Sequence, residues 1–179
     1  ICINQQDIRE RNMQIGIMRH IFATAENVVV WLGPATTKTN LAMDYIAQQN
    51  IMIPENKTTE RSSLQRKLLR FHTVWTVEEG KAFLNLCRTR YWTRVWIVQE
   101  IMYARRITLF CGSRNVQWRM FDGIFQRLKD IQVMGWFHMH RYGPEVLESR
   151  AAVIFEEKRR WEKYPAETGK GMPISTLIG

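Results

Sequence analysis

Glu100 is the residue of this chain best suited to chemistry, because it is a lone carboxylate in the aromatic and aliphatic segment of residues 91–100. We expect a helix there, capped by Thr93, with Glu100 late in it. None of the neighbours three or four positions away is a cation, so no salt bridge within the helix accounts for this carboxylate. Either Glu100 reaches water, or it pairs with an arginine of another element, or it is a working group in a desolvated site. Those neighbours are Trp96, Ile97, Tyr103 and Ala104.

Arginines and loops at strand ends provide further candidates for a ligand site. Arg94 and two arginines shortly before it form either a solvated basic edge or an anion-binding group. Asn4 and Gln5 follow one predicted strand, and the Gly-Pro-Ala-Thr sequence of residues 33–36 follows the next. Open α/β sheets bind ligands at the carboxyl ends of their strands, so both loops are candidate binding positions.

Several common chemical motifs are absent from the sequence. It contains neither a glycine-rich phosphate loop nor a serine nucleophile elbow. His138 and His140 have the spacing of metal ligands, but no second cysteine or histidine pair accompanies them, so we expect no metal site. Residues 112–115, Gly-Ser-Arg-Asn, are expected to form a turn after a strand.

The composition indicates a folded intracellular domain. The 179 residues are 45% apolar, and the three cysteines are too few and too dispersed for a disulfide framework. We therefore expect a reducing compartment, the cytoplasm. No apolar stretch approaches the length of a membrane span, so we expect no membrane insertion. The formal charge is +9, yet basic residues are spread beside acids along the chain, and we expect no specific nucleic-acid binding.

Short apolar runs at residues 1–3, 28–32 and 107–111 predict strands, and segments of helical periodicity separate them. Continuous apolar strands are typical of a parallel sheet covered on both faces, so we expect an α/β fold with helices flanking a parallel sheet. Asp7 and Thr76, each followed three positions later by a glutamate, predict two helix starts. Four tryptophans lie in or beside apolar segments and are expected in the core: Trp31, Trp92, Trp96 and Trp118.

The alternation of apolar strands and helical segments becomes weaker after about residue 130, and the predicted domain organisation follows from that change. Residues 1–130 are expected to be the central part of an α/β domain, and residues 131–179 a mostly helical continuation of it. The chain begins at Ile1 without a methionine and ends in an apolar run, which we interpret as an internal piece of a longer protein. The sheet is therefore expected to be incomplete in this chain.

Taken together, these segments resemble the fungal heterokaryon incompatibility (HET) domain. The resemblance covers roughly residues 1–121 and rests on a combination of pieces that is specific even though no single piece is. The family's opening aromatic strand and its later Asp-Pro-Arg-Asp segment are missing, so the chain looks like the middle of such a domain. The matching pieces are residues 1–5, Val-x-Val-Trp-Leu-Gly at 28–33, Tyr-Trp-x-Arg-Val-Trp-Ile-Val-Gln-Glu at 91–100, and Cys-Gly at 111–112.

The resemblance implies a role in fungal non-self recognition, in which fusion of unlike hyphae triggers growth arrest or programmed cell death. It also implies a flavodoxin-like fold similar to the Toll/interleukin-receptor (TIR) domain. Some TIR domains cleave NAD with a glutamate placed four residues after a tryptophan, and Trp96 and Glu100 have that spacing. By this resemblance Glu100 is the expected catalytic residue, and Trp96, Arg94, Asn4 and Gln5 are the expected binding residues.

Two hypotheses follow for the activity. In the first, the domain is an effector enzyme: NAD is its substrate rather than a bound cofactor, and Glu100 stabilises the positive charge that develops as the glycosidic bond breaks. In the second, the domain is a signalling module without chemistry that acts through protein partners or self-association. An open cleft beside Glu100 favours the first hypothesis, and a buried ion pair with an arginine of a neighbouring element favours the second.

Overall fold

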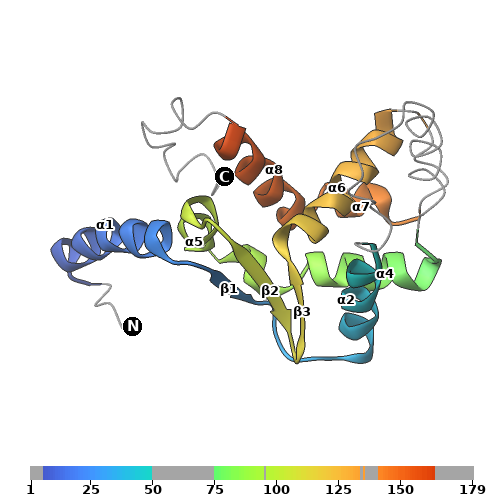
Figure 1. Ribbon diagram of the computed structural model, residues 1–179, viewed down its shortest axis with the longest axis horizontal. Coiled ribbons are helices and arrows are strands. Elements are labelled where there is room, and N and C mark those ends of the chain that lie inside the picture. Colours follow the sequence, from blue (N-terminus) through green and yellow to red (C-terminus); the bar gives the residue numbers. More distant parts are fainter. Residues whose placement is uncertain (1–5, 50–74, 95, 134, 136–140, 164–179) are drawn as a thin grey trace.

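The computed structural model describes residues 6–49, 75–94, 96–133, 135 and 141–163, with the side chains of residues 11, 12 and 15 not described. The first helix, α1 (Ile8–Thr24), begins where the Asp7 carboxylate accepts hydrogen bonds from the backbone N–H groups of Arg9 (2.9 Å) and Glu10 (3.0 Å). This start was predicted from the sequence. Figure 1 shows α1 extending away from the rest of the protein, beside α5 (Ile97–Tyr103).

Several apolar side chains of α1 are exposed. Ile8, Ile17 and Ile21 are 62%, 43% and 45% exposed, whereas Phe22 packs against the core. Helix α1 extends past the sheet and, within the described part of the chain, packs chiefly along α5. Only the end of α1 nearest the sheet is therefore drawn into the apolar interior.

The sheet has three described strands in the order β1 (Val28–Trp31), β2 (Ile107–Cys111) and β3 (Arg114–Gln117) (Figure 1). Strands β1 and β2 pair in parallel, with Val28 opposite Ile107, as the sequence predicted. Strands β2 and β3 pair antiparallel, so the prediction of a purely parallel sheet was wrong. The flavodoxin-like arrangement stays a prediction, because the strand expected at residues 1–3 lies outside the described residues.

A tight hairpin explains the strand that the sequence did not predict. Gly112 and Ser113 form the turn, while Arg114 and Asn115 already belong to β3. Gly112 has a φ of 57°, the left-handed conformation that two-residue hairpin turns require and that glycine adopts without strain. Strand β3 is short and polar, and Val116 is its buried residue. The sequence therefore lacks the apolar pattern of a strand here, which is why residues 112–115 were predicted to be a turn throughout.

One face of the sheet is covered and the other is partly open. Strand β1 alternates between buried Val28 and Val30 and exposed Val29 (60%) and Trp31 (53%). Two helices, α2 (Thr37–Gln49) and α6 (Trp118–Val133), contact β2 and β3. Within the described residues, the expectation that both faces of β1 are covered was therefore wrong, as was the expectation that Trp31 lies in the core.

The core is an aromatic cluster assembled from segments far apart in the sequence. Its members come from α4 (Val77–Cys87), the short 3-10 helix η2 (Arg90–Thr93), α6 and α8 (Arg150–Lys163), and α7 (Gly143–Leu147) packs against α4 and α6. Trp118 stacks on Phe155 with ring centroids 3.6 Å apart. Because α8 contributes to the same core as α4 and α6, the segment after residue 130 is packed onto the α/β part. Among the described residues, the fully buried aromatic side chains are Trp92, Phe83, Phe121, Phe125 and Phe155.

Helix α4 begins with the capping box that the sequence predicted. The Glu79 backbone N–H donates to the Thr76 hydroxyl (3.2 Å), and the Thr76 backbone N–H donates to the Glu79 carboxylate (2.7 Å). No helix within the described ranges is long and apolar enough to cross a membrane. The expected boundary between residues 130 and 131 stays a prediction.

Replacing Gly112 with alanine is expected to destabilise the protein by about 1–3 kcal/mol, because alanine is strained at this φ and its Cβ would overlap the side chain of Ala35. Gly123→Ala is the matched control. It lies inside α6 with open space around its Cβ position, so the same substitution should stabilise by about 0.5–1 kcal/mol. Urea unfolding of the two full-length variants measures both changes. Equal stability of the two variants would contradict the role given to the hairpin glycine.

Candidate functional site

Glu100 lies in the first turn of a short helix rather than late in a longer one. Helix α5 begins at Ile97 with Trp96 as its N-cap residue, whereas Thr93 ends η2 and its hydroxyl donates to the Arg90 carbonyl (2.9 Å). The prediction that Thr93 caps this helix was therefore wrong. The 3-10 turn uses the Thr93 hydroxyl locally, and the helix starts four residues later. A carboxylate in a first turn is favoured by the helix dipole.

Two side chains from the segment before α5 hold the Glu100 carboxylate. The Tyr91 hydroxyl donates to Glu100 Oε2 at 3.2 Å, and Arg94 Nη2 lies 3.9 Å from Glu100 Oε1. The Glu100 side chain is 18% exposed, whereas that of Arg94 is 55% exposed. The Arg94 guanidinium also lies 5.8 Å from the centre of the Tyr91 ring. The three residues therefore form one polar cluster at the edge of the aromatic core.

Tyr91 is the member of this cluster that sequence reasoning missed. Its ring packs edge-on against Trp92, with centroids 5.2 Å apart, and the residue is buried. Burial raises the pKa of the Tyr91 phenol far above its ordinary value, and the negative charge of Glu100 raises it further. The phenol therefore stays a hydrogen-bond donor to Glu100 at neutral pH. The sequence contained Tyr91 nine positions before Glu100, but no local rule links the two across η2.

Helix α5 carries a second buried polar group, the side-chain amide of Gln99, and its oxygen has no partner among the described residues. Gln99, directly before Glu100, is 9% exposed, and its Oε1 atom has no hydrogen-bond partner in the described part of the chain. Buried polar atoms are paired in the great majority of cases, so such an exception calls for a specific explanation. Adjacent residues of α5 thus carry one held carboxylate and one unpaired amide oxygen.

The remaining predicted site residues divide into described and undescribed positions. Trp96 is half-buried at the N-cap position of α5, one turn before Glu100. Asn4 and Gln5 lie outside the described residues, as do His138 and His140. The carboxyl ends of β1 and β2 lie side by side, because the Gly112 backbone N–H donates to the Gly33 carbonyl at 2.9 Å. Within the described ranges, no three or more histidine, cysteine or acidic side chains are grouped to hold a metal ion.

Two observations bear on the hypotheses for Glu100. The ion pair between Arg94 and Glu100 is long, and the Arg94 side chain is half-exposed. Arg94 belongs to the segment directly before α5. Neither of the two cavities described below is lined by Glu100. The geometry thus gives Glu100 defined partners, and its catalytic role stays a prediction.

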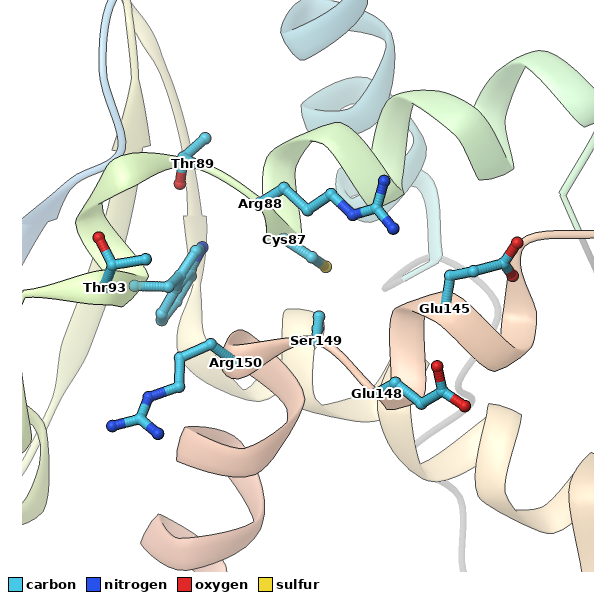
Figure 2. A pocket seen from close by; sticks show the side chains of 9 residues that line it. Cys87, Arg88, Thr89, Thr93, Glu145, Glu148, Ser149 and Arg150 are labelled. Carbon is cyan, nitrogen blue, oxygen red and sulfur yellow. The ribbon is translucent and has the colours of Figure 1, made fainter. Parts of the chain in front are cut away.

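One cavity, of about 370 Å³, lies between the end of α4, η2 and the junction of α7 with α8 (Figure 2). Cys87 and Ser149 are its potential nucleophiles. Burial raises the pKa of the Cys87 thiol far above its ordinary range, so the thiol stays protonated. The Ser149 hydroxyl donates to the Val146 carbonyl (2.6 Å) and accepts from the Ala152 backbone N–H (3.3 Å), which caps α8. Both groups therefore serve the fold.

Comparison with known proteins identifies the family. The family model described as "Heterokaryon incompatibility protein (HET)" matches residues 1–100, which include the Glu100 cluster. A curated relative, the heterokaryon incompatibility protein 6, OR allele, of Neurospora crassa, is 28% identical over 143 residues. The alignment covers 69% of this chain and 21% of the relative, so the chain spans a small part of that protein. No solved structure matches. The chain belongs to the heterokaryon incompatibility (HET) family.

Proposed function

We propose that this chain is the working module of a protein in fungal heterokaryon incompatibility, and that it triggers death of the fused cell. The family match over residues 1–100 and the name of the Neurospora crassa relative support this role. The matched region ends at Glu100 and includes the whole segment that holds its carboxylate. The proposal locates the activity in that segment.

The proposed fold of the complete domain is a TIR-like parallel sheet. The parallel pairing of β1 with β2, separated in sequence by helices α2, α4 and α5, supports it. In this arrangement a strand at residues 1–3 would lie in the same sheet and bring Asn4 and Gln5 to its carboxyl edge. The antiparallel β3 is an addition at the edge of the three-stranded sheet opposite β1.

The proposed reaction is hydrolysis of the bond between nicotinamide and ribose in NAD. Tyr91 holds Glu100 Oε2, and Oε1, which Arg94 approaches only to 3.9 Å, would face the ribose. The glycosidic bond breaks with its electron pair passing to the nicotinamide nitrogen, and the carboxylate stabilises the positive charge left on the sugar. Water then adds to that carbon and releases a proton. The products are nicotinamide and ADP-ribose.

Arg94 and Trp96 have supporting roles in this proposal. The Arg94 guanidinium is more than half exposed and only weakly held by Glu100 at 3.9 Å, so it can turn to a phosphate of the dinucleotide. Trp96 is half-buried at the start of α5 and would bound the site beside the nicotinamide. The observation that carries the proposal is the polar cluster of Tyr91, Arg94 and Glu100, with the spacing of Trp96 and Glu100 expected from the resemblance.

A non-enzymatic assembly module is the alternative, and exposed apolar side chains favour it. Met13 and Ile17 on α1 are 59% and 43% exposed, and Val29 and Trp31 on β1 are 60% and 53% exposed. Exposed apolar surface of this kind is typical of protein-binding faces. In this alternative Glu100 serves only to hold Tyr91 and Arg94 in place.

Replacing Glu100 with glutamine is expected to cost under about 1 kcal/mol of stability. The amide oxygen still accepts from Tyr91, and the lost ion pair with Arg94 is long and half-exposed. By contrast, Trp92→Ala empties a fully buried position and should cost at least about 3 kcal/mol. Urea unfolding of the two full-length variants, followed by tryptophan fluorescence, compares them. A Glu100→Gln variant as unstable as Trp92→Ala would make Glu100 a structural residue.

Expression of the full-length protein in a fungal host tests the proposed reaction in the cell. The wild-type protein should kill and deplete NAD, and Glu100→Gln at equal abundance should do neither. Glu78→Gln, a change at an exposed position of α4, removes one carboxylate elsewhere and should behave as the wild type. A Glu100→Gln variant that kills as well as the wild type would overturn the catalytic role and favour assembly.

A further inference from the structure

A second cavity, of about 510 Å³, lies away from Glu100, beside the starts of β2 and α6 and along α8. Its volume is in the range of pockets that bind small organic molecules. Its lining contains five cationic side chains and three carboxylates, and this excess of positive charge is its distinguishing feature. These cations are Arg105, Arg106, Arg119, Lys158 and Arg159.

Three of the five cations are matched by the carboxylates. Arg159 Nε lies 3.1 Å from Asp122 Oδ1, and Lys158 Nζ lies 3.2 Å from Glu162 Oε1. Arg106 Nη2 lies 3.8 Å from Glu26 Oε1. Lys158 is buried and also donates to the carbonyls of two residues at the end of α5, so its ammonium group is fixed by the fold.

Arg105 and Arg119 remain without an ion pair to any described residue. Arg105 lies in the connection between α5 and β2, and Arg119 in the first turn of α6; both are exposed. The five cations and three carboxylates around the cavity thus leave an excess of two positive charges.

Two further features of the lining favour an anion. The start of α6, a helix of 16 residues, lines the cavity through Trp118 and Arg119, and the amino end of a helix carries partial positive charge. Arg159 has a buried Nη2 atom without a hydrogen-bond partner in the described structure, and its ion-pair partner Asp122 likewise has no hydrogen bond to its buried Oδ1 atom. A donor of this kind is satisfied by an acceptor such as a phosphate oxygen.

We infer that this cavity binds a free small molecule carrying a doubly charged phosphate or diphosphate group, held by Arg105 and Arg119 at the start of α6. Arginine suits this task because its planar guanidinium donates two parallel hydrogen bonds to phosphate oxygens. The carboxylates interspersed around the rim disfavour a long polyanion such as nucleic acid. The inference does not rest on the proposed NAD cleavage, since Glu100 does not line this cavity.

Isothermal titration calorimetry of the full-length protein with inorganic diphosphate and with ADP, at fixed ionic strength, tests the inference. We expect saturable binding of both, and a loss of at least about tenfold in affinity when Arg105→Gln and Arg119→Gln are combined. The matched control combines Arg9→Gln and Lys81→Gln, which removes the same charge at exposed positions outside the cavity. Its affinity should change by less than about twofold. Each single variant at Arg105 or Arg119 is titrated as well, so that the test stands if the double variant is unstable.

Three results would overturn the inference. The first is absence of saturable binding of diphosphate and ADP to the wild-type protein. The second is an equal loss of affinity in the cavity variant and the control variant, which would reduce the effect to overall charge. The third is binding to vesicles that contain phosphorylated inositol lipids without binding to either soluble probe, because the phosphate would then be a membrane headgroup.

Discussion

The packing of Trp92 is the constraint on which the rest of the described structure depends. Its indole is 1% exposed and donates to the Leu86 carbonyl at 3.0 Å, and its ring meets aromatic side chains of α6 and α8. Burial of so much aromatic area contributes several kcal/mol, on the order of the net stability of a domain. Because Trp92 fixes η2, it also fixes Tyr91, and through Tyr91 the carboxylate of Glu100.

Polar chemistry is therefore concentrated at the rim of the aromatic core. On one side, η2 and the first turn of α5 hold Glu100 between a neutral phenol and a half-exposed arginine. On another side, Lys158 of α8 donates a hydrogen bond to the carbonyl at the end of α5. The two arginines without an ion pair, Arg105 and Arg119, line the cavity there. Helix α5 is common to both places, since Glu100 lies in its first turn and Arg105 follows its end. The same short helix thus positions the carboxylate and borders the cationic cavity.

Local signals in the sequence were enough to predict some elements, and contacts over long distances in sequence account for the rest. The cap by Asp7 and the capping box of Thr76 depend on residues three positions apart, and both were predicted. The polar strand β3 was missed because its pairing with β2 comes from the hairpin at Gly112 rather than from apolar alternation. The cluster around Glu100 and the charge excess of the second cavity need tertiary structure: η2 brings Tyr91 back to α5, and α8 brings Arg159 to Asp122 of α6.

Release of nicotinamide from NAD by the purified full-length protein tests the central claim, the catalytic role of Glu100, most directly. Chromatography of the reaction mixture would quantify nicotinamide and ADP-ribose over time. The account predicts equal amounts of the two products with the wild-type protein and a loss of at least about a hundredfold in rate with Glu100→Gln. Nicotinamide release by Glu100→Gln at the wild-type rate, or none from a wild-type preparation that kills in the cell, would contradict it.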